Sequence, residues 1–98
     1  MQTLINIKAS QPQHVPAGVL LGKMYYGGFL SRALTRNEYS GYPHNGGEHT
    51  LYLTMGHQDL GAFLSLVEET YQGKHGATEF VEAVRAIVRK NYPRLQLN

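Results

Sequence analysis

The last 40 residues of the chain place apolar residues at helical intervals in two separate stretches. The first stretch follows Asp59, which can cap a helix, and stops at Gly73. The second follows Thr78, another capping residue, and stops before Pro93, because a residue that precedes proline is pushed out of helical geometry. The apolar positions are Leu60, Phe63, Leu64, Val67 and Tyr71, then Phe80, Val81, Val84, Ile87, Val88 and Tyr92. The pattern predicts a hairpin of two amphipathic helices.

Two other segments alternate apolar and polar residues, which is typical of strands buried on one face. They span residues 3–9 and 48–56, and the second alternates more clearly. The apolar side of the alternation carries Ile5, Ile7, Ala9, Leu51, Leu53 and Met55. Residues 10–18 lie between a strand and the next apolar run, and Pro12 and Pro16 there favour an irregular connector.

Residues 19–26 are ambiguous between strand and helix. Each interior glycine weakens a helix by about 1 kcal/mol, and the paired tyrosines that end this segment favour a strand. We therefore predict a strand here, a tight turn at Gly27 and Gly28, and a returning strand over residues 29–36. For residues 29–36 the alternative is a short helix, since Leu30, Ala33 and Leu34 also fit one helical face.

Together these segments predict an α+β fold. We expect an antiparallel sheet of three to four strands, with the C-terminal helical hairpin packed on one face. The chain of 98 residues fits a single domain over residues 1–98.

The composition excludes several classes of protein. Because the chain has no cysteine, it cannot carry a disulfide scaffold, a thiolate zinc site or a cysteine nucleophile. No apolar run reaches the roughly 18–20 residues of a membrane span, so we expect no membrane association. The first 16 residues lack the pattern of a signal peptide, which makes the cytoplasm the expected compartment.

The histidines do not form a recognisable catalytic or metal-binding motif. His44, His49 and His57 are five and eight residues apart, whereas ligands on one element are usually three or four apart. The sequence also lacks a Gly-x-Ser-x-Gly nucleophile elbow and a phosphate-binding glycine loop. We therefore predict no catalytic residue, no metal and no cofactor, and favour a protein that is not an enzyme over one that is.

Residues 39–49 form the most suggestive segment for function. This polar connection is longer than a hairpin needs, and it holds Tyr39, Tyr42, His44 and His49 among glycines and asparagine. Tyrosine and histidine offer stiff aromatic area with a polar tip. With Tyr26 in the nearby turn, these residues predict a partner-binding surface. Our leading hypothesis is a small interaction or inhibitor module that acts on a larger protein, an outline that compact phage and bacterial accessory proteins often fit.

Two alternatives belong to other classes. The first is nucleic-acid or nucleotide binding, with phosphate contacts from the basic C-terminal residues and stacking on tyrosines. Those basic residues are Arg85, Arg89, Lys90 and Arg94. The second is a small phosphoesterase or hydrolase centred on His49. Self-association is also open, because an uncovered edge strand can pair with a second copy of the chain.

Overall fold

The computed structural model of the chain describes residues 4–33, 39–40 and 51–95. In chain order the elements are β1 (Leu4–Ala9), the single-turn helix η1 (Pro12–His14), α1 (Val15–Tyr26), α2 (Phe29–Ala33), β2 (Tyr39–Ser40), β3 (Leu51–Gly56), α3 (His57–Thr70) and α4 (Ala77–Asn91). The radius of gyration is 12.2 Å, close to the value of about 13 Å for a compact domain of 100 residues. The α+β class predicted from the sequence is confirmed.

The sheet is antiparallel and has the order β1-β3-β2. Its body is the pair β1 and β3, joined along their full length with Ile7 opposite Leu53, while β2 adds only two residues at the far edge of β3. The odd-numbered residues of β1 and β3 are buried, as the alternation predicts. On the other face, the Thr54 hydroxyl donates to Oδ1 of Asn6 at 2.9 Å. One face of the sheet is thus apolar and the other polar.

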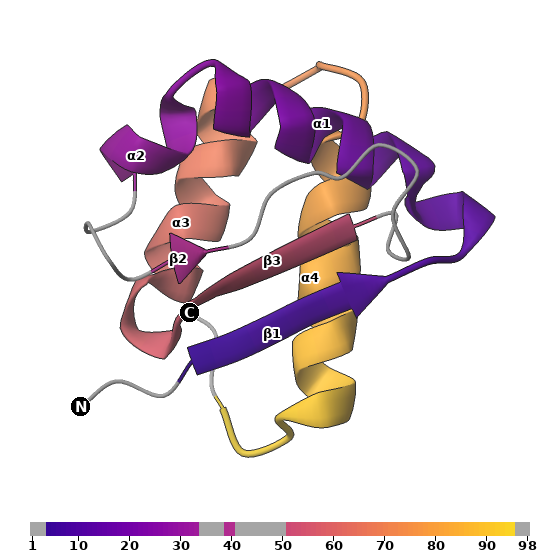
Figure 1. Ribbon diagram of the computed structural model, residues 1–98, viewed down its shortest axis with the longest axis vertical. Coiled ribbons are helices and arrows are strands. Elements are labelled where there is room, and N and C mark those ends of the chain that lie inside the picture. Colours follow the sequence, from indigo (N-terminus) through magenta and orange to yellow (C-terminus); the bar gives the residue numbers. More distant parts are fainter. Residues whose placement is uncertain (1–3, 34–38, 41–50, 96–98) are drawn as a thin grey trace.

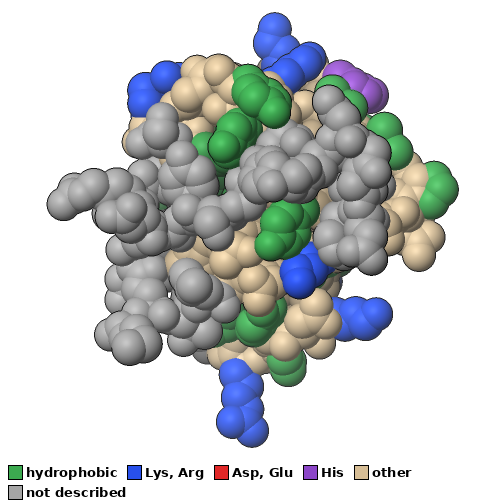
Figure 2. All heavy atoms as spheres, viewed as in Figure 1, with side chains coloured by type: hydrophobic (Ala, Val, Ile, Leu, Met, Phe, Trp, Pro, Cys, Tyr) green, Lys and Arg blue, Asp and Glu red, His purple; other side chains and the backbone are tan. Residues whose placement is uncertain are grey.

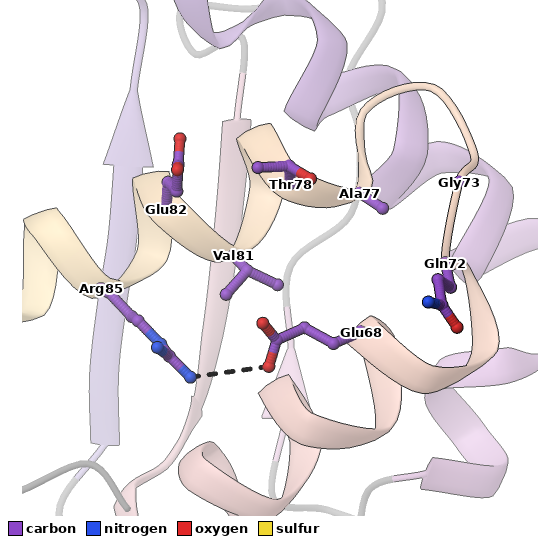
Figure 3. A pocket seen from close by; sticks show the side chains of 8 residues that line it. All are labelled: Glu68, Gln72, Gly73, Ala77, Thr78, Val81, Glu82 and Arg85. Atoms are coloured by element: carbon purple, nitrogen blue, oxygen red, sulfur yellow. Dashed lines mark ion pairs between the residues drawn. The ribbon is translucent and has the colours of Figure 1, made fainter.

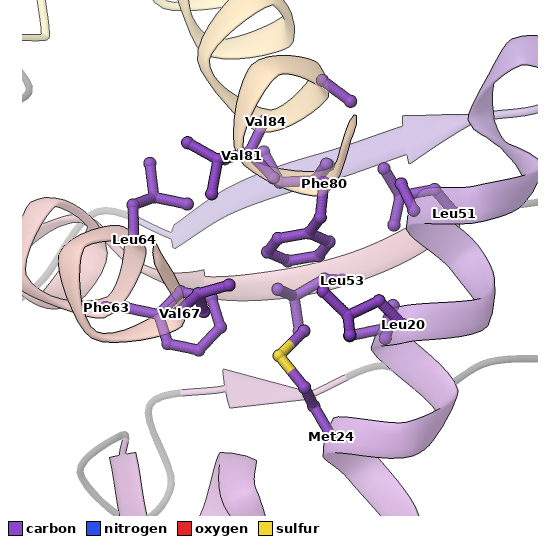
Figure 4. Close-up of a cluster of buried hydrophobic side chains, with 14 of the residues drawn as sticks. Leu20, Met24, Leu51, Leu53, Phe63, Leu64, Val67, Phe80, Val81 and Val84 are labelled. Atoms are coloured by element: carbon purple, nitrogen blue, oxygen red, sulfur yellow. The ribbon is translucent and has the colours of Figure 1, made fainter. Parts of the chain in front are cut away.

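The helices cover the apolar face of the sheet (Figure 1). α3 begins directly after β3, and α4 packs against α3, α1 and β1, which confirms that the two C-terminal helices pack on the sheet. Side chains from α1, α3, α4 and β3 converge in the core (Figure 4). At its centre the rings of Phe63 and Phe80 meet edge to face, with centroids 6.1 Å apart. Such aromatic pairs add about 0.5–1.5 kcal/mol beyond the area they bury.

The predicted strand over residues 19–26 is wrong, because this segment belongs to the helix α1. Two interior glycines cost this helix about 2 kcal/mol. Leu20, Leu21 and Met24 are spaced for one helical face and are fully buried, and each contributes about 1.5–3 kcal/mol. The free energy gained by burying these three side chains therefore outweighs the low helix propensity of the two glycines. Pro16 lies in the first turn, where a helix tolerates proline because the missing N–H has no intrahelical partner.

Gly27 and Gly28 do form a turn, but the turn joins two helices rather than two strands. Gly28 has φ of 81°, the left-handed region that glycine adopts without strain. The next residue, Phe29, enters the core, where its ring contacts Tyr71 edge to face at 5.2 Å. The predicted strand over residues 29–36 is also corrected: residues 29–33 form α2, the short-helix alternative, and residues 34–36 lie outside the described residues.

The caps of both C-terminal helices differ from those predicted. Gly56 is the N-cap of α3 and Gly76 is the N-cap of α4, so that Asp59 and Thr78 lie inside their helices. Gly76 has φ of 91°, and a Cβ built on it would lie 2.4 Å from the carbonyl oxygen of Pro16. A backbone approach this close excludes any side chain, so Gly76 sets how tightly α4 docks on the start of α1. The predicted end of α4 before Pro93 is confirmed.

Candidate functional site

α1 is apolar on the side that faces away from the core as well as on the side that enters it. Val15, Val19 and Tyr26 have 48%, 46% and 75% of their surface exposed. With Gly22 they follow the intervals 4, 3 and 4, which place all four residues along one side of the helix. We call these four residues the α1 stripe. Among the described residues, four of the five large hydrophobic side chains that are exposed belong to α1, the fourth being Tyr25.

The aromatic end of the α1 stripe is held in place by its neighbours. The rings of Tyr25 and Tyr26 meet edge to face with centroids 5.1 Å apart. Beyond them, Nη1 of Arg32 donates a hydrogen bond to the carbonyl oxygen of Gly27 at 3.4 Å. This contact brings the guanidinium to the C-terminal end of α1, where the helix dipole favours positive charge. Lys23, one turn before Gly27, is exposed on the same side as the stripe.

Charge in the described residues is divided between two regions. The first acidic residue of the sequence is Glu38, so β1, α1 and α2 carry Lys8, Lys23 and Arg32 and no carboxylate. The acidic residues within the described ranges all lie on α3 and α4: Asp59, Glu68, Glu69, Glu79 and Glu82. Figure 2 shows one face of the molecule, on which lysine and arginine side chains are visible and no described acidic side chain is. Within α1 and α2, the helix of the stripe and its neighbour, the charged residues are therefore all basic.

Of the partner-binding residues predicted from the sequence, Tyr26 lies in the α1 stripe. Tyr39 belongs to β2, while Tyr42, His44 and His49 lie outside the described residues, so the loop prediction stays a prediction. Val15 and Val19 were not predicted. The signal that points to them is that residues 15–26 contain a single charged residue, Lys23, so that a helix over this segment has apolar residues on its outer side as well as its inner side.

The four basic residues predicted to contact phosphate do not form one uniform row. Nη2 of Arg85 lies 3.6 Å from Oε1 of Glu68, across the recess between α3 and α4 (Figure 3). The other three, Arg89, Lys90 and Arg94, are exposed near the end of α4. Nucleic-acid binding through this set stays a prediction.

The recess itself has a volume of about 400 Å³. It is lined by Glu68, Gln72, Gly73, Ala77, Thr78, Val81, Glu82 and Arg85. Two carboxylates oppose one guanidinium there, so the charge of its lining does not favour phosphate. Nε of Arg85 is buried and, among the described residues, has no hydrogen-bond acceptor.

Two further findings concern chemistry and membranes. In the described ranges, no three histidine or acidic side chains are grouped closely enough to hold a metal ion. His44, His49 and the side chain of His57 fall outside that statement. No helix of the described chain has both the length and the apolar character needed to cross a bilayer.

The outer edge of β1 bears on self-association. The backbone N–H of Asn6 donates to the hydroxyl of Tyr92 at 3.1 Å. Tyr92 is the C-cap residue of α4. This N–H points away from β3, because it is not used in the sheet. A second copy of the chain that paired with β1 would have to displace this hydroxyl. Lys8 on the same strand also disfavours edge-to-edge pairing.

Comparison with known proteins adds no assignment: no family model, no curated protein and no solved structure matches the chain.

Proposed function

We propose that this chain is a small non-catalytic binding module, an interaction or inhibitor protein that acts on a larger protein partner. The observation that carries the proposal is the α1 stripe. Val15, Val19 and Tyr26 are exposed, whereas the opposite side of α1 is buried in the core. Exposed apolar side chains gathered on one element mark interaction sites more often than single exposed side chains do.

The residues of the α1 stripe suit a binding role. Tyr26 presents a large ring with few rotatable bonds, so ordering it on a partner costs little entropy, and tyrosine is common among residues that dominate binding energy. Gly22, between Val19 and Tyr26, has no side chain to hold a partner away from the helix. Residues 39–49, with Tyr42 and His44, are the second region that we propose for partner contact.

The test is capture of a partner by affinity-tagged protein from an extract of the cells that produce it, with quantitative mass spectrometry. The key variant combines Val19→Gln with Tyr26→Ala. A matched control combines Glu79→Gln with Glu82→Gln on the exposed side of α4. We expect the stripe variant to recover at most about one tenth of the partner, since a binding residue of this kind contributes 2 kcal/mol or more.

The control variant should recover the partner at the wild-type level. Equal recovery by the stripe variant and the wild type, with both folded by circular dichroism, would refute a role for α1. A third variant with Tyr39, Tyr42 and His44 changed to alanine tests the loop separately. If neither the stripe variant nor the loop variant loses any partner, both proposed surfaces are wrong, and if the wild-type protein captures no partner, the proposed function is wrong.

A further inference from the structure

We propose that the α1 stripe binds an acidic amphipathic helix of the partner protein. This inference rests on the proposed function and adds the chemical class of the partner segment. It requires two properties of the partner: an apolar seam that matches the stripe in shape, and carboxylates that flank this seam. Both requirements follow from the placement of described residues on α1 and α2.

The spacing of the α1 stripe fits a helix. Intervals of 4, 3 and 4 residues form a straight apolar seam, the arrangement through which two helices interlock their side chains. From Val15 to Tyr26 the seam spans 12 residues, or roughly 16 Å along the axis from first to last at about 1.5 Å per residue. A partner helix of three to four turns covers that length. An extended strand would instead need side chains at alternate positions of a sheet edge, which α1 does not offer.

The flanking charges call for an acidic partner. Lys23 is exposed beside the stripe, and Arg32 lies at its tyrosine end through the hydrogen bond to Gly27. No carboxylate occurs in the first 37 residues that could neutralise either charge from within α1 or α2. Opposite charges at the rim of an interface raise the association rate and exclude partners of like charge. Glutamates on either side of a partner's seam supply this complement.

The same observations disfavour two other occupants. A second copy of the chain, docked α1 to α1, would bring Lys23 and Arg32 together with their equivalents and supply no opposite charge from these elements. A membrane surface is disfavoured by the shape of the helix. Ala17, Leu20, Leu21 and Met24 are committed to the core, so α1 cannot turn the broad apolar face to lipid that interfacial helices use.

The test uses two synthetic peptides of about 18 residues, long enough for partial helix in isolation. Both carry leucine at the intervals 4, 3 and 4, with glutamate at the flanking positions in one and lysine in the other. Binding to the full chain is measured by fluorescence anisotropy at low salt. We expect the glutamate peptide to bind about tenfold more tightly, since two surface charge pairs change from repulsion to attraction. This preference should shrink as salt rises.

The decisive variant is Lys23→Glu combined with Arg32→Glu, which should bind the lysine peptide more tightly than the glutamate peptide. A reversed preference cannot arise from loss of folding. Val19→Gln with Tyr26→Ala should bind both peptides at least about tenfold more weakly. The control Glu79→Gln with Glu82→Gln should leave both affinities unchanged.

Equal affinity for the two peptides, preference for the lysine peptide, or no binding of either would overturn the inference. The inference would also be overturned if the chain bound phosphatidylglycerol vesicles but neither peptide. The same holds if the wild type sedimented as a dimer and the stripe variant as a monomer. The proposed function is judged apart from these results. If the stripe variant loses its partner in cell extract while the peptides fail, the function holds and the partner's chemistry is different.

Discussion

α1 and α4 pack against each other on the same side of the sheet, yet their outer surfaces differ. α4 turns its apolar side chains inward, among them Phe80, Val84 and Val88, and carries Glu79 and Glu82 outward. It is an ordinary surface helix with one apolar and one charged side. α1 is apolar on both sides, and Lys23 is the single charged residue within it. A helix with that pattern is normally covered on all sides.

The difference separates the part of the molecule that buries its own apolar side chains from the part that leaves some of them exposed. The buried apolar side chains of β1, β3 and α4 pack into the core. At the end of α4, the Tyr92 hydroxyl also accepts a hydrogen bond from the edge of β1. α1 leaves Val15, Val19 and Tyr26 in water. If this interpretation is correct, substitutions on the inner side of α4 change stability, and substitutions on the outer side of α1 change binding alone.

Phe80→Ala should have the largest effect on stability. Phe80 is fully buried in α4 and packs on Phe63, so truncation leaves a cavity and removes an aromatic contact. We expect a loss of about 3–5 kcal/mol in the free energy of unfolding. Urea denaturation followed by far-UV circular dichroism measures it. Val19→Ala on the outer side of α1 is the control and should change stability by less than about 0.5 kcal/mol. Comparable losses in both variants would contradict the comparison of the two helices.

Gly76→Ala should have the next largest effect, because it acts where α4 meets α1. The new Cβ meets the carbonyl oxygen of Pro16 at 2.4 Å in a backbone conformation with positive φ. Strain and overpacking together predict a loss of about 2–4 kcal/mol in the free energy of unfolding, measured by urea denaturation. Gly73→Ala is a matched control, since φ is 79° there and nothing lies within 4 Å of the added Cβ. It should cost about 1 kcal/mol from the left-handed conformation alone. Equal losses in the two variants would show that the close approach to α1 is not maintained in solution.

Much of the fold follows from local patterns in the sequence. The alternation around Ile7 and Leu53 fixes which side of the sheet is buried, and the stripe around Phe80 fixes the inner side of α4. Pro93 marks the end of α4 because its geometry excludes a continuing helix. Each of these patterns depends on residues that are close together in the chain, so each can be recognised from the sequence alone.

The helix α1 and its stripe could not be predicted in the same way. Gly18 and Gly22 lower the helix propensity of this segment, and the burial that compensates for them comes from residues distant in the sequence. A strand over this segment would place Val19 and Tyr26 on opposite faces, so the exposed series from Val15 to Tyr26 exists only in the helix. The turn at Gly28 was predicted correctly as a turn, but a turn residue does not specify which elements it joins.

Tyr92→Phe should have a smaller effect, since it removes one hydroxyl from a partly exposed position. The N–H of Asn6 loses its acceptor at the edge of β1, and we expect a loss of about 0.5–1.5 kcal/mol in urea denaturation. The freed edge should also make the protein associate more strongly with itself, which sedimentation velocity over a range of concentrations detects. A variant as stable as the wild type and equally monomeric would show that the Tyr92 hydroxyl does not protect this edge.

Val15→Gln combined with Val19→Gln should have the smallest effect on stability and is the most direct test of the exposed side of α1. Glutamine has a higher helix propensity than valine, so the free energy of unfolding should stay within about 0.5 kcal/mol of the wild type or rise slightly. The glutamate peptide should nevertheless bind this variant at least about tenfold more weakly than the wild type. If another part of the chain covers the two valines in solution, the variant should instead lose about 1.5–3 kcal/mol for each buried side chain. Unchanged stability with lost binding would mark α1 as a surface kept apolar for a partner, since the fold itself gains nothing from these two valines.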